Sequence, residues 1–153
     1  MPCKTFINDY PGFKHCILCD SSDEGFHVEE NNKEFIINNI SKKRFMVIEI
    51  DGCIIKKEQK KCDYLFINCN ESKFYFVELK GRNVPYAVKQ ILATLDKFKT
   101  NEFYKKSESV NAYIVTSRKN PNVISSERND VDTELGAKKG RLYFSEFKYV
   151  LDV

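Results

Sequence analysis

Residues 62–80 read CDYLFINCNESKFYFVELK, and this stretch decides the fold. It holds two apolar runs, 62–69 and 74–80, in which β-branched and aromatic residues are frequent, as they are in strands. Four polar residues at 70–73 separate the runs, so the stretch predicts an antiparallel hairpin. Apolar residues occupy both faces of this hairpin, which is expected when helices cover a sheet on both sides.

The loop of this hairpin fixes which residues face each other. With 70–73 as the loop, Leu65 faces Glu78 and Asp63 faces Lys80. Asp63, Glu78 and Lys80 then share one face, because side chains two residues apart along a strand point the same way. Asp63 lies diagonally from Glu78 in this register, with roughly 7 to 8 Å between their backbones. Two carboxylates at that separation can both ligate one small cation.

The segments on either side of the hairpin extend the sheet. Residues 45–50 predict a strand, Asp51-Gly52 a turn, and 53–55 the start of a partner strand, so a first hairpin is expected there. After the second hairpin, residues 84–98 predict a helix and 111–116 a strand. Because this strand directly follows a helix, we expect it to run parallel to the strand that ends at Lys80.

The helix at 84–98 has clear signals at its start. Asn83 is a good N-cap, and Pro85 falls in the first turn, where its missing N–H costs no helical hydrogen bond. One helical stripe carries the apolar side chains of Val84, Val88, Ile91, Leu95 and Phe98.

The remaining segments complete an α/β order. Residues 1–27 are expected to form loops and a short strand, 29–40 a helix, because Phe35, Ile36 and Ile40 are neighbours at helical spacing, and 141–144 the last strand. The order αβββαβ predicts a central mixed β-sheet flanked by helices. The chain of 153 residues suits one domain, 1–153, with its core at about 29–144.

Composition excludes several classes of protein. Hydrophobic residues make up 42% and charged residues 31%, so a folded globular domain is expected rather than disorder. No run approaches the roughly 18 to 20 apolar residues that a membrane span needs. The N-terminus lacks a basic flank followed by an apolar run, so we expect a cytoplasmic protein without a membrane partner. Its six cysteines are accordingly expected to be reduced.

The charges at the end of the hairpin carry the main functional signal. Cys62-Asp63, a second strand and then Glu78-Leu79-Lys80 resemble the signature of the PD-(D/E)xK, or restriction-endonuclease-like, nuclease superfamily, with Cys62 where the signature has Pro. The resemblance covers about residues 45–116. A cross-strand salt bridge would explain an isolated pair of charges, but three charges share this face.

The resemblance implies a restriction-endonuclease-like core and a metal-dependent nuclease that hydrolyses phosphodiester bonds in nucleic acid, with DNA as the leading substrate. Asp63, Glu78 and the main-chain carbonyl of Leu79 would hold Mg²⁺ or Mn²⁺, which prefer oxygen ligands. Lys80 would position or deprotonate the attacking water.

Further positions are candidates by the same resemblance. Gln90 lies on the flank of the helix at 84–98, where some family members place a catalytic Gln, although Thr94 stands where a Tyr would strengthen the likeness. An acidic residue on the first helix often assists, and Glu30 and Glu34 are the candidates. Ordinary exposed helix residues are the alternative for all three.

Basic residues near the site are expected to contact nucleic-acid phosphates, although solvated loops are an equally good account of them. The net charge of +3 alone does not indicate a nucleic-acid binder. A homodimer would supply two active sites for cutting both strands of a duplex. The candidate phosphate contacts are Lys56, Lys57, Lys60, Lys61, Arg82, Lys138, Lys139 and Arg141.

Other motifs carry weaker signals. His15-Cys16-Ile17-Leu18-Cys19 has the spacing of half a zinc site, but structural zinc would need Cys3 or a distant ligand. With His15 and His27 as its only histidines, the chain does not resemble the Ser-His-Asp hydrolases. Two alternatives to a nuclease remain open: a non-catalytic nucleic-acid-binding or interaction module on the same fold, and a structural protein in which the three charges form salt bridges.

Overall fold

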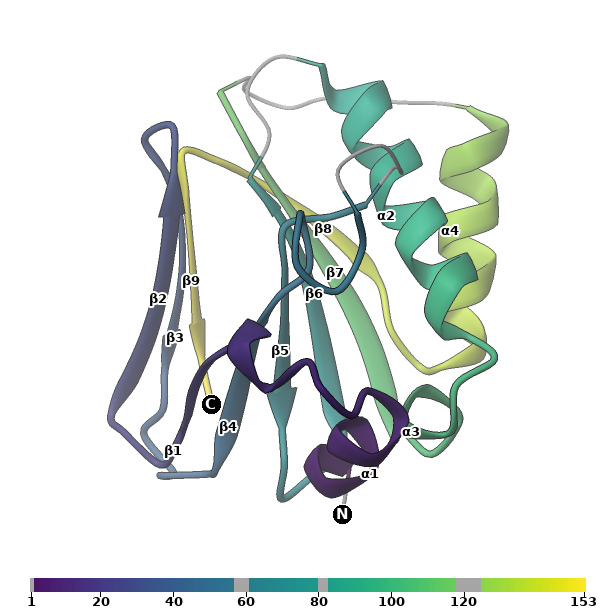
Figure 1. The fold of residues 1–153 in the computed structure, drawn as a ribbon. Coiled ribbons are helices and arrows are strands. Elements are labelled where there is room, and N and C mark those ends of the chain that lie inside the picture. Colours follow the sequence, from purple (N-terminus) through teal and green to yellow (C-terminus); the bar gives the residue numbers. More distant parts are fainter. Residues whose placement is uncertain (1, 57–60, 80–82, 118–124) are drawn as a thin grey trace.

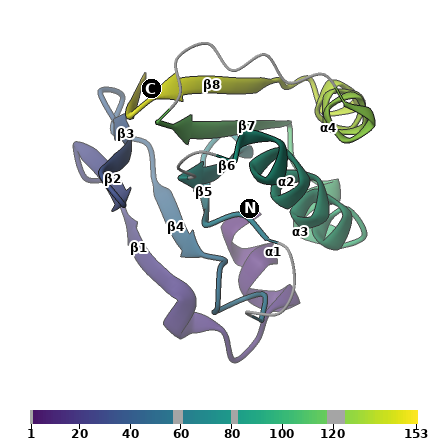
Figure 2. The same cartoon turned by 90° about the horizontal axis from the view of Figure 1, so that it is seen from above.

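The computed structural model describes residues 2–56, 61–79, 83–117 and 125–153. These residues form an α/β fold of three layers, with a mixed sheet in the middle (Figure 1). The middle sheet has the strand order β1-β4-β5-β6-β7-β8, and a second sheet has the order β2-β3-β9. The helices cover one face of the middle sheet and the second sheet covers part of the other (Figure 2).

The described elements follow one another along the chain as α1 (Pro2–Asp9), η1 (Lys14–Cys16), β1 (Ile17–Ser21), β2 (Gly25–Glu30), β3 (Lys33–Asn38), β4 (Phe45–Glu49), β5 (Tyr64–Asn68), β6 (Lys73–Leu79), α2 (Val84–Phe98), α3 (Glu102–Lys105), β7 (Ser109–Thr116), α4 (Ser126–Ala137), β8 (Leu142–Glu146) and β9 (Lys148–Asp152).

The predicted hairpin is confirmed as β5 and β6, but its register differs by two residues. Leu65 pairs with Phe76 instead of Glu78, because the loop is 69–72 and not 70–73. The side chain of Asn68 explains the difference. Its Oδ1 accepts hydrogen bonds from the backbone N–H groups of Asn70 and Glu71, both at 3.1 Å, so the turn starts one residue early. A two-residue shift leaves every side chain on its predicted face.

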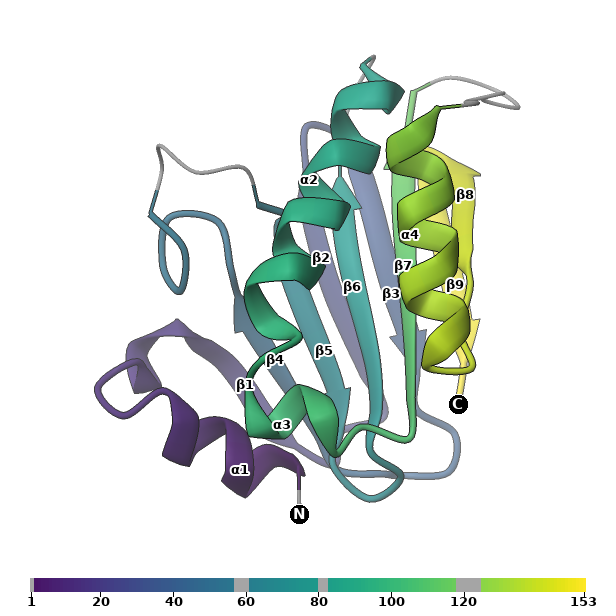
Figure 3. The same cartoon turned by 90° about the vertical axis from the view of Figure 1, so that its right-hand side faces the viewer.

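The helix α2 and the crossover after it are also confirmed. The Asn83 side chain accepts a hydrogen bond from the Tyr86 N–H at 3.0 Å, and Pro85 lies in the first turn. The strand β7 pairs with β6 in parallel. Figure 3 shows α2 and α4 side by side on one face of the middle sheet, with α2 packed against β6 and β7 and α4 against β7 and β8.

The helix predicted at 29–40 is wrong: β2 and β3 form a hairpin there. Phe26, Val28, Phe35 and Ile37 are buried at a spacing of two, which is the period of a strand. The turn consists of Asn31 and Asn32, whose positive φ angles of 49° and 64° Asn tolerates well. The first helix of the predicted order αβββαβ is therefore absent from residues 29–40. The β2-β3-β9 sheet covers the face of the middle sheet where this helix was expected.

Other strand boundaries need correction as well. The first hairpin does not form, because β4 pairs with β1 and β5, while residues 50–55 fold into a tight turn. Gly52 has a φ of 75° in this turn, and its N–H donates to the carbonyl of Ile55 at 2.9 Å. The last strand is not 141–144: β8 ends at Glu146, and β9 follows and pairs in parallel with β3.

Two hydrophobic clusters hold the layers together. One lies between the helices and the middle sheet, and the other lies between the two sheets. Cys3 and Phe6 of α1 join the first cluster, and Tyr149 and Leu151 of β9 join the second. Both ends of the chain therefore contribute to the core. None of the described helices is long and apolar enough to cross a membrane.

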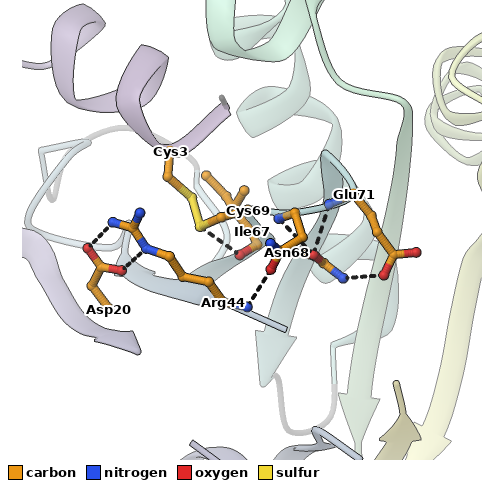
Figure 4. Close-up of a disulfide and its surroundings, with 8 residues drawn as sticks. Cys3, Asp20, Arg44, Ile67, Asn68, Cys69 and Glu71 are labelled. Carbon is orange, nitrogen blue, oxygen red and sulfur yellow. Dashed lines mark hydrogen bonds and ion pairs between the residues drawn. A yellow bond between two sulfur atoms is a disulfide. The ribbon is translucent and has the colours of Figure 1, made fainter. Parts of the chain in front are cut away.

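The expectation of reduced thiols is wrong for four cysteines. Cys3 is bonded to Cys69, which attaches α1 to the loop between β5 and β6 (Figure 4). Beside it, Arg44 makes a bidentate ion pair with Asp20, which connects the start of β4 to the end of β1. Cys16 and Cys53 form a further disulfide, and the sulfurs of Cys19 and Cys62 are free.

Candidate metal centre

A polar cavity of about 200 Å³ opens at the carboxyl end of β6. Four acidic residues from four different segments meet in it, which we call the carboxylate site: Glu30, Asp51, Asp63 and Glu78. Its other lining residues are Asn31, Leu79 and Gln90.

Main-chain pairing positions Asp63 and Glu78. The Asp63 N–H donates to the Val77 carbonyl at 3.1 Å, which continues the β5–β6 pairing and brings Asp63 opposite Glu78. The Leu79 N–H donates to Asp63 Oδ2 at 2.8 Å and fixes the carboxylate. Asp63 is 7% exposed and Glu78 is 1% exposed, so both lie away from bulk water. Sequence reasoning placed these carboxylates diagonally; the observed register brings them closer.

Glu30 and Asp51 complete the carboxylate site from outside the hairpin. Glu30 ends β2 on the inward side, in the row of Phe26 and Val28. Asp51 follows β4 at the turn of residues 50–55, and its Oδ1 lies 3.5 Å from Lys61 Nζ. Glu30 was predicted to lie on a helix, and it lies at the end of strand β2 instead. Asp51 was not predicted, because its turn was assigned to a hairpin.

The acidic groups interact at short range. The carboxyl groups of Glu30 and Glu78 line the same cavity as that of Asp63 and lower its pKa, whereas the charge of Asp51 raises it. Burial, followed by the charges of Asp63 and Asp51, raises the pKa of Glu30 to about 7. Burial also raises the pKa of Asp63, against the opposing effect of the Leu79 N–H. Such a group of acids must take up protons or a cation, because like charges this close repel strongly.

The helix α2 holds the segment that carries Asp63. Gln90 Nε2 donates to the Lys61 carbonyl at 3.0 Å. The Thr94 hydroxyl accepts from the Cys62 N–H at 2.7 Å and donates to the Gln90 carbonyl at 2.8 Å. Gln90 was a predicted site residue, and it does line the cavity. Thr94, which departs from the family likeness, has a clear positioning role in this chain.

Gln90 also presents an acceptor to the site. Its Oε1 is buried, and it has no hydrogen-bond partner among the residues that the structure describes. Burying an amide oxygen without a donor is costly, so this atom is suited to a ligand that the cavity would admit.

Cys62 is an inert neighbour of the site. It is fully buried, and burial raises the pKa of its thiol well above the usual range, with the charge of Glu78 adding to the effect. The thiolate is the reactive form of cysteine, so this residue is unsuited to act as a nucleophile.

Several predicted residues lie elsewhere. Glu34 is on the outer face of β3, where its Oε1 is 3.0 Å from His27 Nε2, and it does not reach the carboxylate site. Lys61 is buried against Asp51, while Lys56 is exposed at the end of the 50–55 turn. Lys57, Lys60, Lys80 and Arg82 fall outside the described residues.

The basic residues after α4 do not join the site. The carbonyls of Lys138 and Arg141 accept hydrogen bonds from Val110 and Ala112, near the start of β7, whereas Glu78 lies beside the end of that strand. Lys138 Nζ donates to the Ser107 carbonyl at 2.8 Å, and Lys139 is paired with Glu108 at 3.0 Å. These three positions lie toward the opposite end of the middle sheet.

A larger cavity of about 560 Å³ lies between the two sheets, at that opposite end. Three tyrosines line it, together with acids that already have partners: Glu71 lies 3.3 Å from Lys73, and Asp152 accepts from Asn38 at 3.0 Å. It therefore lacks the crowded acids that distinguish the smaller cavity.

No protein-family model, curated protein or solved structure matches this chain. The carboxylate site is therefore interpreted from its own residues. Its donor set consists of carboxylate oxygens and an amide oxygen, which are the ligands that Mg²⁺ and Mn²⁺ prefer. The residues present fit such a cation.

Proposed function

We propose that this chain is a metal-dependent nuclease of the PD-(D/E)xK type, which hydrolyses phosphodiester bonds in nucleic acid, with DNA as the leading substrate. The observation that carries the proposal is the meeting of Asp63 and Glu78 on neighbouring strands, in a small polar cavity with Glu30 and Asp51. The succession of β4, β5, β6, α2 and β7 supports the proposal, because it sets three strands before a helix and a further strand after it.

The cation would be held by Asp63 and Glu78, with the Leu79 carbonyl as the further ligand that the resemblance implies. A cation held there would supply Lewis acidity, which lowers the pKa of a bound water and offsets charge on a phosphodiester. Glu30 and Asp51 line the same cavity and would add negative charge around the cation. The backbone N–H of Leu79 donates a hydrogen bond to the Asp63 carboxylate and fixes its orientation.

The other residues act on position and protons. Thr94 and Gln90 hold the backbone at 61–62 and therefore the place of Asp63. Glu30 lines the same cavity as Asp63 and Glu78 and is placed to accept a proton from a water molecule there. Lys80 directly follows Leu79 and is the proposed partner of the attacking water.

A substrate panel tests the proposal. Purified protein is incubated with single-stranded, double-stranded and branched DNA and with RNA, in Mg²⁺, Mn²⁺ or EDTA. Cleavage that requires the cation and disappears in Glu78→Gln supports a nuclease. A protein that binds nucleic acid tightly but cleaves none of these substrates in either metal is the non-catalytic module instead.

A further inference from the structure

His15, Cys16 and Cys53 lie together although they come from distant parts of the chain. Cys16 ends η1, and Cys53 lies in the turn of residues 50–55. A ring nitrogen of His15 and the two cysteine sulfurs all lie within 4.8 Å of one another. Cys53, and not Cys19, therefore lies beside the His15-Cys16 motif, since the sulfur of Cys19 contacts Ser21.

The two disulfides differ in their exposure to a reductant. Cys3 and Cys69 are each 1% exposed, so neither sulfur of that bond is open to attack. Cys53 is partly exposed, although Cys16 is fully buried. Thiol–disulfide exchange requires access to a sulfur atom, so the Cys16–Cys53 bond should be reduced first.

We propose that His15, Cys16 and Cys53 form a zinc site when the Cys16–Cys53 disulfide is reduced. A dithiol reductant attacks Cys53 Sγ, releases the Cys16 thiolate and then closes its own disulfide, so two electrons pass to the protein and both cysteines become thiols. Zn²⁺ binding then displaces the two thiol protons to solvent. Two thiolates and one imidazole are donors that Zn²⁺ favours, and water completes the tetrahedron.

Cys16 and Cys53 would keep the 50–55 turn attached to η1 in both redox states. As a disulfide, the bond from Cys16 to Cys53 makes this connection directly. After reduction, the zinc ion would replace it. The site is separate from the carboxylate site in chemistry: thiolates and imidazole select zinc, whereas carboxylates select Mg²⁺ or Mn²⁺. The proposal therefore does not depend on nuclease activity.

Cobalt is the probe for this site, because Co²⁺ bound to thiolates absorbs in the near ultraviolet and Zn²⁺ displaces it. The full chain is reduced with a phosphine, desalted without oxygen and titrated with Co²⁺, then with Zn²⁺ or Mg²⁺. Reduced protein should develop thiolate absorption that saturates at one equivalent and is lost to Zn²⁺ but not to Mg²⁺. Protein left oxidised should develop none.

Variants assign the ligands. Cys53→Ser should lose the thiolate absorption, and His15→Ala, which keeps both cysteines, should bind Co²⁺ more weakly by at least the about 10- to 100-fold typical of losing an outer-shell partner. The double variant Cys3→Ser/Cys69→Ser is the matched control: it lacks the other disulfide and should bind Co²⁺ like the wild type. The proposal is overturned if reduced wild type shows no thiolate absorption, if Cys53→Ser keeps it, or if His15→Ala binds with unchanged affinity.

Discussion

Replacing Asp63 with Asn should stabilise the metal-free protein and remove its response to Mn²⁺. Burial raises the pKa of Asp63, and the negative charge of Asp51 adds to this effect, so the ionised form of Asp63 is disfavoured in the folded protein. Asn has nearly the same shape, and its Oδ1 can still accept the hydrogen bond that the Leu79 N–H makes at 2.8 Å. The substitution therefore removes a charge while leaving the packing in place.

The size of the effect follows from electrostatics. Two unit charges 4 Å apart repel by about 4 kcal/mol at an effective dielectric constant of about 20. Protons taken up by the acids relieve part of this repulsion, so we expect a gain of about 1–3 kcal/mol at pH 8 in EDTA. Mn²⁺ at about 100 times its Kd should stabilise the wild type by about 2.7 kcal/mol. It should scarcely stabilise Asp63→Asn.

Urea unfolding at pH 8 in EDTA and in Mn²⁺ measures both effects. Glu108→Gln is the control, because Glu108 is paired with Lys139 toward the opposite end of the middle sheet, and its response to Mn²⁺ should equal that of the wild type. A network of structural salt bridges makes the opposite prediction for Asp63→Asn. A loss of stability in EDTA, or a Mn²⁺ response as large as that of the wild type, would refute the reasoning.

Three further predictions concern pH, positioning and salt. Because the pKa of Glu30 is raised to about 7, the folded metal-free protein keeps a proton that the unfolded chain loses near pH 4.5; its Tm in EDTA should fall as pH rises from about 4.5 to 7, and a flat profile would contradict this. Thr94→Val should cost about 1–3 kcal/mol of unfolding free energy, because the buried Cys62 N–H loses its acceptor, while Thr94→Ser should cost clearly less. Affinity for DNA should fall steeply between low and moderate salt if phosphate contacts dominate binding, and an affinity unchanged by salt would exclude this.

The parts of the fold that were predicted correctly are those with local signals. The β5–β6 hairpin consists of two apolar runs separated by a polar loop, and α2 has a capping Asn83 and a continuous apolar stripe. The register was missed because one side chain, that of Asn68, starts the turn early. Its error of two residues was harmless to the site, since side chains keep their face when a strand shifts by two.

The errors concern contacts between distant segments. The run at 35–40 has apolar residues at both helical and strand spacing, and only packing of Phe35 and Ile37 against the middle sheet decides for a strand. Glu30 was therefore named correctly but assigned to the wrong element. Asp51 could not be found from local sequence, because it reaches the site through the turn that follows β4. The pairing of Cys16 with Cys53 is equally non-local.

The central claim is tested most directly by single-turnover cleavage of DNA in Mn²⁺, measured beside calorimetric Mn²⁺ titration for the wild type, Glu78→Gln and Lys80→Ala. Glu78→Gln should lose both Mn²⁺ binding and cleavage while it stays folded. Lys80→Ala should still bind Mn²⁺ but cleave at least about a hundredfold more slowly, because it lacks the group that positions the attacking water. Equal Mn²⁺ binding by all three proteins, or cleavage by Lys80→Ala at the wild-type rate, would contradict the assignment.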